Sequence, residues 1–558
     1  MLSNYIISLY WIKKQFGGDK KIYWSTLTHN GVLFPPDYVP INIPIIYKEK
    51  KIILNPEAEE AAIFYSKYIG TEYVNNKFNK NFWKDFKKLI DPKFGIEALE
   101  DINFDNIKTY LEKERGKKLD RTKEEKDRIK EKQTILEEKY TVAIIDGKEQ
   151  PVGNFRIEPP GIFIGRGCHP MIGRIKKRVY PKDIILNLGK TAEVPDTCIK
   201  GQKWNQVIND NTVTWLASWK EDITGKTKYV RLSDKSDFKS ESDKNKFDLA
   251  RKLKKKLGDI RKVNEENLNN DVYKTKQLAT ALYFIENLSL RVGNEKGKDE
   301  ADTVGVVSLR VEHIDLLGDN RIKLDFLGKD SVRYTKKFEV IPIIYTNISL
   351  FMQNKDKKTE LFDQIYPSDI NTYLQNFMPG LTTKVFRTMN ASKLFQKELN
   401  KVTSKFESYS HDDKINLLLD EFNKANAKVA MLCNHQKNIN KNFKDQVDKI
   451  NQKLKDVKKK KIELEQKKAE YKEKGKDIKA IKERISKIED KIKSIKSKKD
   501  LKLEMKNVSL GTSKVNYIDP RITIAFAKKQ NIDINILLQE ALQDKFSWAL
   551  NVSTDFIF

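Results

Sequence analysis

The sequence predicts a multidomain protein of the α+β class, with a β-rich N-terminal half and a mainly helical C-terminal half. Its 558 residues suffice for about three or four domains of roughly 150 residues each. Hydrophobic residues make up 39% of the chain, enough to build buried cores. Strand-like alternation is common before about residue 235, whereas helical spacing of apolar residues predominates after it.

The N-terminal half is expected to contain short strands and a few helices. The run KIIL at 51–54 is typical of a strand, and PEAEEAAIFYSKYIG at 56–70 is typical of a helix. A single charged helix is predicted over about 111–138, because i,i+4 ion pairs support its polar faces. Three more runs between turn residues predict strands: TVAIIDG, VTWLASW and KYVRLSD.

A basic loop, IEPPGIFIGRGCHPMIGRIKKRV, interrupts this β-rich region. Arg166 lies between two of its glycines, which allow the backbone to approach a partner closely. Four more cations follow, Arg174, Lys176, Lys177 and Arg178. The cluster favours a phosphate-contacting loop as much as a plain surface turn.

Two helices and a β-hairpin are predicted next. The helices cover 247–262 and 274–293, and Gly293 is expected to stop the second one. Apolar and polar residues alternate on both sides of Gly328-Lys329-Asp330, which predicts a hairpin with Lys329 at its tip.

An isoleucine seam then indicates a coiled coil. The isoleucines follow Gly475 at alternating spacings of three and four residues, and similar apolar spacing precedes that glycine. We therefore predict two helices that turn at Lys474-Gly475-Lys476 and pair antiparallel; a disordered basic spacer is the alternative that the unbroken seam disfavours. The seam residues are Ile478, Ile481, Ile485, Ile488, Ile492 and Ile495.

These patterns divide the chain into five predicted regions. They are an N-terminal cap region (1–120), a β-rich core subdomain with the basic loop (121–235), a mainly helical core subdomain (236–437), a coiled-coil linker (438–506) and a compact tail made of a helix, a turn and a second helix (507–558).

The charge balance indicates a polyanionic partner. Lys and Arg number 107 against 79 Asp and Glu, a net charge of +28. The cations cluster with aromatic and amide residues, which favours nucleic acid over an anionic membrane surface. No apolar run reaches the roughly 18 residues of a membrane helix. Three separated cysteines without a CxxC pair disfavour a zinc site and suit a reducing interior.

Several catalytic classes lack their motifs. The GKT triplets at 189–191 and 225–227 are not Walker A loops, because Ile184 and Lys220 occupy the positions that require glycine. Carboxylates do not cluster as a magnesium site would require, and the five histidines show no paired-ligand spacing. We therefore expect no metal and no cofactor.

A tyrosine nucleophile remains for a basic protein of this kind. A tyrosine can attack a phosphodiester and conserve the bond energy as a phosphotyrosine. Two arginines and an imidazole would stabilise the charged transition state, and a lysine could protonate the leaving 5′-oxygen. A free phenol has a pKa of about 10, so the surrounding cations must also favour the phenolate.

The sequence contains these parts in unusual contexts. Arg291 is expected to end an apolar helix in LSLRVGNEK, Lys329 lies in FLGKDS, and Arg387 lies in KVFRTMNAS. His435 lies in AMLCNHQ and Tyr517 in TSKVNYIDPRIT. Most single residues of these types are structural or solvated, so composition alone does not unite them.

These motifs, in this order, resemble those of the eukaryotic type IB DNA topoisomerases. The matching segments are IEPPG with GRG, LRVGNEKGKDEADTVGVVSLRVEHIDL, FLGKDSVRY, KVFRTMNAS, LCNHQ and LGTSKVNYIDPRIT, and the resemblance covers nearly the whole chain. It implies that Tyr517 is the nucleophile. It also implies that Arg291, Lys329, Arg387 and His435 activate the reaction.

The resemblance implies a set of DNA-binding residues as well. Arg166, Asp330 and Asn516 correspond to residues at the cleavage site, where camptothecin-type inhibitors stack in relatives. Ile164 and Cys168 depart from the residues common in relatives, arginine and asparagine. The remaining implied DNA contacts are Lys228, Tyr229, Lys246, Val292, Gly293, Asn294, Glu295, Lys296, Thr303, Thr382, Thr383 and Lys384.

By the same resemblance, the fold would be a bilobed clamp around duplex DNA, with a β-rich cap and a catalytic domain of the tyrosine recombinase and type IB topoisomerase kind. The expected protein is a monomer without membrane association. It would relax supercoiled DNA in the nucleus or another genome-containing organelle. Two alternatives stay open: a site-specific tyrosine recombinase and a non-enzymatic protein that bridges duplexes.

Overall fold

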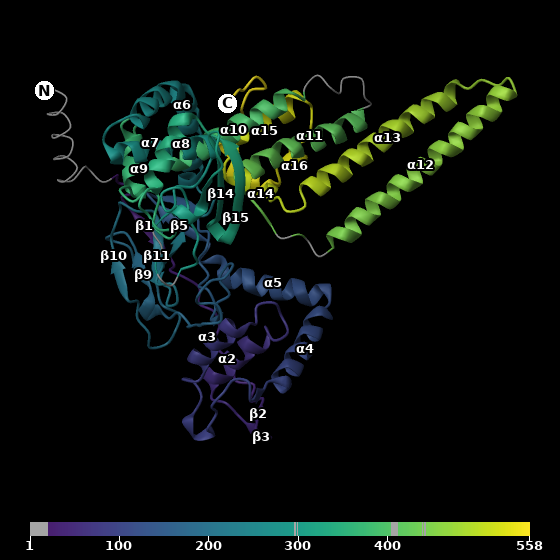
Figure 1. Ribbon diagram of the computed structural model, residues 1–558. Helices are drawn as coiled ribbons and strands as arrows, with labels where there is room; N and C mark the ends of the chain where they lie inside the picture. The colour runs from purple at the N-terminus through teal and green to yellow at the C-terminus, as the bar shows by residue number, and fades with distance from the viewer. Residues whose placement is uncertain (1–20, 295–296, 298–299, 403–410, 438, 440–441) are drawn as a thin grey trace. The chain divides into compact units, whose positions relative to one another are not determined.

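The structure is a computed structural model that describes the chain except residues 1–20, 295–296, 298–299, 403–410, 438 and 440–441 (Figure 1). It divides into two compact units. Unit 1 comprises Met1–Glu241 with Lys296–Asp302, and unit 2 comprises Ser242–Glu295 with Thr303–Phe558. Unit 1 contains most of the strands, and unit 2 is mainly helical. The mixed α+β class is therefore confirmed.

The first core of unit 1 joins a small sheet to two helices. The predicted helix at 56–70 is present, and three phenylalanines spaced four apart, Phe78, Phe82 and Phe86, are fully buried beside it. This spacing places the three rings on one face of a helix. The elements are β2 (Ile45–Tyr47), β3 (Lys50–Ile52), β4 (Ile102–Asn103), α2 (Pro56–Ser66) and α3 (Asn76–Phe86), with strand order β3-β2-β4.

The second core of unit 1 is built on two sheets. The three predicted strand runs at 141–147, 213–219 and 228–234 all contribute strands. Trp24, Leu186 and Trp219 lie in the shared core. The sheets are β1 (Leu27–His29), β5 (Val142–Ile145) and β6 (Lys148–Pro151), in that order, and β10 (Gln206–Ile208), β9 (Ile185–Asn187), β11 (Trp215–Lys220) and β12 (Thr227–Arg231), in that order.

The prediction of one helix over 111–138 is wrong. The segment forms α4 (Asp105–Leu119) and α5 (Lys123–Glu138) instead. The Thr122 side chain accepts a hydrogen bond from the Glu125 N–H at 3.2 Å, and the Glu125 carboxylate accepts one from the Thr122 N–H at 3.0 Å. This capping box satisfies the first amide groups of α5, so a new helix begins at that point.

The basic loop connects two short paired strands, β7 (Gly161–Ile162) and β8 (Ile175–Lys176). Gly165 and Gly167, on either side of Arg166, have φ angles of +66° and +59°. Residues that carry a side chain rarely adopt such backbone angles, so the glycines account for the tight turn. Arg166 itself is exposed.

Unit 2 surrounds one large hydrophobic core with helices. The predicted hairpin is confirmed: β14 pairs antiparallel with β15, with Gly328 opposite Val332 at the tip. The strands are β13 (Ile314–Leu316), β14 (Arg321–Gly328) and β15 (Val332–Glu339). The principal helices are α6 (Asp237–Leu268, whose first turn belongs to unit 1), α7 (Tyr273–Leu288), α8 (Pro342–Met352), α9 (Pro367–Gln375), α10 (Thr383–Asn400), α11 (His411–Leu432), α14 (Leu510–Asn516), α15 (Pro520–Lys529), α16 (Ile534–Leu537) and α17 (Glu540–Lys545).

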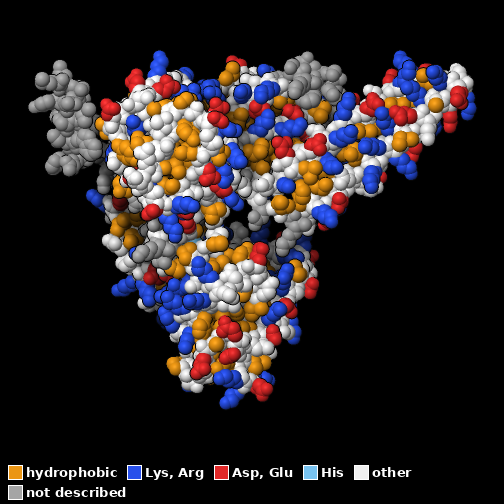
Figure 2. Space-filling view, viewed as in Figure 1, with side chains coloured by type: hydrophobic (Ala, Val, Ile, Leu, Met, Phe, Trp, Pro, Cys, Tyr) orange, Lys and Arg blue, Asp and Glu red, His pale blue; other side chains and the backbone are white. Residues whose placement is uncertain are grey.

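Two long helices lie side by side in unit 2 and turn back at Gly475 (Figure 1). They are α12 (Phe443–Glu473) and α13 (Lys479–Glu504). Val457 on α12 and Ile485 on α13 are both buried, and Lys461 forms a 2.7 Å ion pair with Glu489 across the pair. Figure 2 shows basic and acidic side chains mixed along the side of these two helices that faces the viewer. The helical hairpin is therefore present, while its supercoiling stays a prediction.

The prediction that α7 extends to Gly293 is wrong by five residues. The helix ends at Leu288, because Ser289 adopts a left-handed backbone conformation with φ of +53°. The chain then leaves the helix, so Arg291 lies on a non-helical segment. That segment is hydrogen-bonded to 306–307: the Val306 N–H donates to the Arg291 carbonyl at 2.9 Å, and the Val307 N–H donates to the Val292 carbonyl at 2.8 Å.

The backbones of Gly293 and Gly305 approach each other closely. A Cβ atom on Gly305 would lie 2.3 Å from the Gly293 nitrogen and 2.7 Å from the Arg291 carbonyl oxygen. Both neighbours are backbone atoms, which cannot rotate away. Only glycine at 305 therefore allows the segment that carries Arg291 to lie this close.

We expect Gly305→Ala to destabilise unit 2 by about 1–3 kcal/mol, the usual cost of overpacking. Gly258→Ala is the matched control, because Gly258 lies within α6 with open space around its Cβ position. The control should stabilise the helix by roughly 0.5–1 kcal/mol. Urea unfolding measures both variants, and an unchanged midpoint for Gly305→Ala would contradict the close approach.

No helix among the described residues is both long and apolar enough to cross a membrane.

Candidate active site

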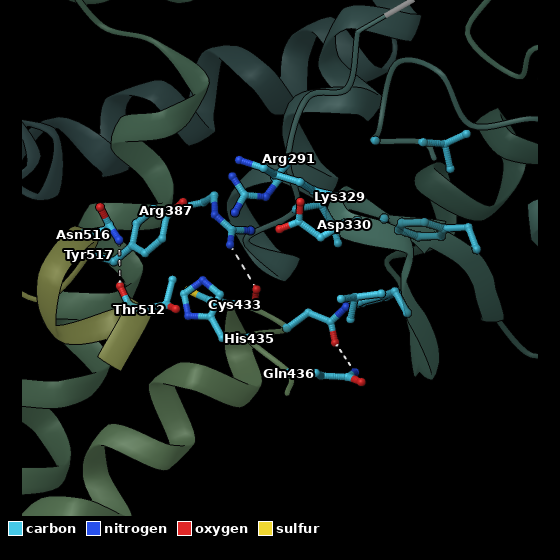
Figure 3. A pocket seen from close by; sticks show the side chains of 18 residues that line it. Arg291, Lys329, Asp330, Arg387, Cys433, His435, Gln436, Thr512, Asn516 and Tyr517 are labelled. Carbon is cyan, nitrogen blue, oxygen red and sulfur yellow. Dashed lines mark hydrogen bonds between the residues drawn. The ribbon is translucent and has the colours of Figure 1, made fainter. Parts of the chain in front are cut away.

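A cavity of about 300 Å³ in unit 2 brings together residues from distant parts of the chain (Figure 3). All five residues proposed for the reaction line it: Arg291, Lys329, Arg387, His435 and Tyr517. They come from the segment after α7, the β14–β15 turn, α10, the turn after α11 and the end of α14. The fold thus assembles them although as many as 226 residues separate the first from the last.

Arg387 lines this cavity and is almost fully buried, with 4% of its surface exposed. Its guanidinium donates hydrogen bonds to the carbonyls of Ser289 and Cys433, the latter at 3.0 Å. The guanidinium carbon also lies 5.0 Å from the centre of the Tyr517 ring. Its Nε has no hydrogen-bond partner among the described residues. A buried cation with a spare donor is suited to binding an anion.

His435 lies against the same tyrosine. Its ring stacks on the Tyr517 ring with the centres 5.3 Å apart. Its Nδ1 lies 2.8 Å from the hydroxyl of the buried Ser513, while its Nε2 has no partner among the described residues. Burial, and then the charges of Arg387 and Arg291, lower the pKa of His435 from 6.5 to about 4. The ring is therefore neutral near pH 7.

The Tyr517 backbone is hydrogen-bonded at both its N–H and its carbonyl. Its N–H donates to the Ser513 carbonyl at 2.9 Å, at the C-terminal end of α14. Its carbonyl accepts a hydrogen bond from the Ser392 hydroxyl at 3.0 Å, and that hydroxyl also accepts one from the Asp519 N–H at 3.0 Å. Because Ser392 lies on α10 with Arg387, one helix positions both the cation and the tyrosine.

Lys329 lies at the exposed tip of the β14–β15 hairpin, where Asp330 has a φ angle of +66°. The hairpin is attached to the His435 segment through the carbonyl of Arg333. That carbonyl accepts hydrogen bonds from the Asn434 and Gln436 side chains, at 3.4 Å and 3.2 Å. Lys329 is thus exposed, while its hairpin is hydrogen-bonded to the segment that contains His435.

The implied DNA contacts in unit 2 fall into three groups. Asp330 and Asn516 line the cavity. A second group follows Arg291 or begins α10, and Thr303 and Thr383 are buried within it. Lys246 differs, because it forms a 2.9 Å ion pair with Asp243 and lies over the Phe247 ring. The second group comprises Val292, Gly293, Asn294, Thr303, Thr382, Thr383 and Lys384.

The implied contacts in unit 1 are Arg166, Lys228 and Tyr229. Lys228 is exposed on β12, and the half-buried Tyr229 ring packs against Trp215 with the ring centres 5.6 Å apart. Ile164 packs on the core of α2 and α3. Two further implied contacts, Glu295 and Lys296, lie outside the described residues.

Sequence reasoning missed the residues that hold the site together. Ser392 and Ser513 are buried within the cited motifs, and Cys433, Asn434 and Gln436 line the cavity. Serine in a helix carries no signal of its own in a sequence. Its partner becomes evident only when the fold brings another chain segment near.

In the described part of the chain, no group of three His, Cys, Asp or Glu residues could hold a metal ion.

The low pKa of His435 gives a testable pH dependence. In the unfolded chain the ring should protonate near 6.5, whereas in the folded protein it protonates only near 4. The contribution of the neutral ring to the free energy of unfolding is therefore fully present above pH 6.5. It is lost as the pH falls from 6.5 to 4. We expect the His435 NMR resonances of the folded protein not to titrate between pH 8 and 5.5. A folded-state midpoint near 6.5, as in the urea-unfolded control, would contradict the burial argument.

Comparison with known proteins gives a consistent classification. Residues 22–232 match the model of the eukaryotic DNA topoisomerase I DNA-binding fragment, 235–469 match its catalytic core, and 489–558 match the C-terminal topoisomerase domain. All three models describe one class of protein, enzymes that act on DNA. The chain belongs to the eukaryotic DNA topoisomerase I family.

Curated relatives align over nearly all of the chain. DNA topoisomerase 1 beta of Arabidopsis thaliana is 41% identical over 97% of this chain, and the chain spans 60% of that relative's length. DNA topoisomerase 1 of Caenorhabditis elegans is 41% identical over 95% of the chain and 67% of the relative. The Homo sapiens DNA topoisomerase 1 is 38% identical over 96% and 72%, respectively.

Proposed function

We propose that the protein is a type IB DNA topoisomerase. It transiently cleaves one strand of duplex DNA through a 3′-phosphotyrosyl intermediate, lets the DNA downstream rotate, and then rejoins the strand. The observation that carries the proposal is the contact of Arg387 and His435 with the Tyr517 ring in a cavity that Arg291 and Lys329 also line.

In the cleavage step, the Tyr517 oxygen attacks the phosphorus, the P–O5′ bond breaks, and the phenolic proton leaves to solvent. Lys329 donates a proton to the departing 5′-oxygen. Its exposed place at a hairpin tip suits this role, because the ammonium group can reach a bound strand. Religation reverses each transfer.

Charge stabilisation falls to the other three residues. The transition state gathers negative charge on the non-bridging phosphate oxygens. Arg387 is already oriented by two carbonyls and retains an Nε donor, and Arg291 lines the same cavity. Neutral His435 can donate one further hydrogen bond. Prepositioned donors of this kind avoid a reorganisation cost during the reaction.

Neither ATP nor a metal ion is required in this scheme, because each step exchanges one phosphodiester for another. We further propose that the chain acts as a monomeric clamp on supercoiled DNA of either sign, with α12 and α13 as a coiled-coil linker and with the recombinase-like catalytic fold. The genome in the nucleus would be its substrate. Binding of a camptothecin-type inhibitor at the cleavage site belongs to the same proposal.

A supercoil-relaxation assay in EDTA without nucleotide tests the proposal, combined with denaturation to trap a covalent protein–DNA adduct. We expect relaxation of both positive and negative supercoils and an adduct at Tyr517. Binding without an adduct would indicate an architectural protein. Recombined products at one specific sequence would indicate a recombinase.

A further inference from the structure

Ser513 is a buried residue that contacts two of the residues lining the cavity. It has no exposed surface and lies on α14, four residues before Tyr517. Its hydroxyl lies 2.8 Å from His435 Nδ1, and its carbonyl accepts the Tyr517 N–H at 2.9 Å. One residue therefore contacts both the imidazole and the backbone of the tyrosine.

The neutral imidazole of His435 carries one proton, on either Nδ1 or Nε2. If Nδ1 carried it, the Nε2 lone pair would face the side of the ring that has no protein partner. An anionic phosphate oxygen drawn there by Arg387 and Arg291 would then meet a lone pair instead of a donor. If Nε2 carries the proton, the phosphate can accept a hydrogen bond, and Nδ1 needs a donor.

The Ser513 hydroxyl lies within hydrogen-bond distance of Nδ1 and can supply that donor. We propose that Ser513 is a positioning residue that holds His435 in the tautomer protonated at Nε2, so that the imidazole presents its single N–H to the reacting phosphate. This inference rests on the proposed function for its catalytic consequence. The tautomer itself is a property of the protein without DNA.

Three features of the site hold the imidazole and the Ser513 hydroxyl in place relative to each other. The hydrogen bond is buried, so water does not compete for Nδ1. The His435 backbone is itself held, because its N–H donates to the Ala430 carbonyl at 2.8 Å and its carbonyl accepts the Ser509 N–H at 2.9 Å. Ser509 precedes α14, so the ring and the hydroxyl belong to segments that are joined at two points.

The first test is spectroscopic and needs no DNA. Protein labelled with ¹⁵N-histidine is measured by NMR near pH 7, and His435 is assigned by the loss of its signals in His435→Gln. We expect a protonated Nε2 and an unprotonated, hydrogen-bonded Nδ1. A proton on Nδ1 in the wild-type protein would overturn the proposal, whatever the activity of any variant.

Variants then test the role of the hydroxyl. Ser513→Ala should shift His435 toward a mixture of tautomers, while Ser513→Thr, which retains a hydroxyl, should restore protonation at Nε2. Ser66→Ala is the matched control, because Ser66 is also a buried helical serine, bonded to its own helix in unit 1. An unchanged tautomer in folded Ser513→Ala, with folding checked by thermal unfolding, would also overturn the proposal.

A double-mutant cycle tests the catalytic consequence. Ser513→Ala is expected to slow single-turnover cleavage of a duplex by roughly tenfold to a hundredfold, the usual range for a residue that orients another. In the His435→Gln background the same change should slow cleavage less than about twofold, because the two effects share one pathway. Equal slowing in both backgrounds would show that Ser513 acts through Tyr517 or stability instead. If wild-type protein failed to cleave DNA, the proposed function would fail while the tautomer result would stand.

Discussion

Tyr517→Phe is expected to abolish both the covalent adduct and DNA relaxation. The substitution removes only the oxygen that would attack phosphorus and retains the ring that contacts Arg387 and His435. Loss of a nucleophile typically lowers a rate by many orders of magnitude, so we expect at least about a thousandfold reduction. Relaxation of supercoiled plasmid and gel analysis of trapped adducts measure the effect, and DNA binding should persist.

Tyr334→Phe is the matched control for this variant. Tyr334 lines the same cavity, but it is 7% exposed and stacks on Phe326 with the ring centres 5.2 Å apart. Burial raises its pKa to about 12, which keeps the phenol protonated. We expect this variant to form the adduct and to relax DNA within about tenfold of the wild-type rate. Relaxation by Tyr517→Phe at the wild-type rate would reject the nucleophile assignment.

Lys329→Ala is expected to give the second large effect, a slowing of cleavage by roughly a hundredfold to ten-thousandfold. The physical reason is that an alkoxide is a poor leaving group unless it receives a proton. A substrate with a 5′-thiolate leaving group needs no such proton. On that substrate we therefore expect the variant to cleave nearly as fast as the wild-type protein.

Lys323→Ala controls for the loss of one positive charge on the same hairpin. Lys323 lies on β14 and pairs with Asp315 at 3.0 Å, away from the tip. It should leave cleavage of both substrates almost unchanged. Single-turnover cleavage with normal and thiolate substrates provides the measurement. If Lys329→Ala slowed both reactions equally, the lysine would bind DNA rather than donate a proton.

Local patterns predicted the elements whose side chains repeat regularly. The alternation around Lys329 predicted the hairpin and its tip, and the isoleucine spacing predicted the paired helices. The errors occurred at helix ends. The break at Thr122 depends on a reciprocal cap, and the end of α7 depends on the left-handed Ser289, neither of which changes the apolar spacing.

The candidate reactive residues were predicted by resemblance of their motifs, not by spacing. Arg291 and Tyr517 are 226 residues apart, and no local rule links them. Their roles stay predictions that the experiments above test. The fold adds what the motifs lack: Ser392 ties the Tyr517 backbone to the helix of Arg387, and Ser513 contacts His435.

The sequence by itself determined the α+β class and the basic character, because both depend on composition or short-range order. The candidate site residues came from the resemblance of their motifs. Only the tertiary structure decided that a buried imidazole, two arginines and a phenol share one cavity, and which serine hydroxyls contact the histidine and the tyrosine. The physical reason is that hydrogen-bond direction and burial arise between segments distant in the chain. A protonation state such as that of His435 therefore depends on the packed environment, not on its neighbours in sequence.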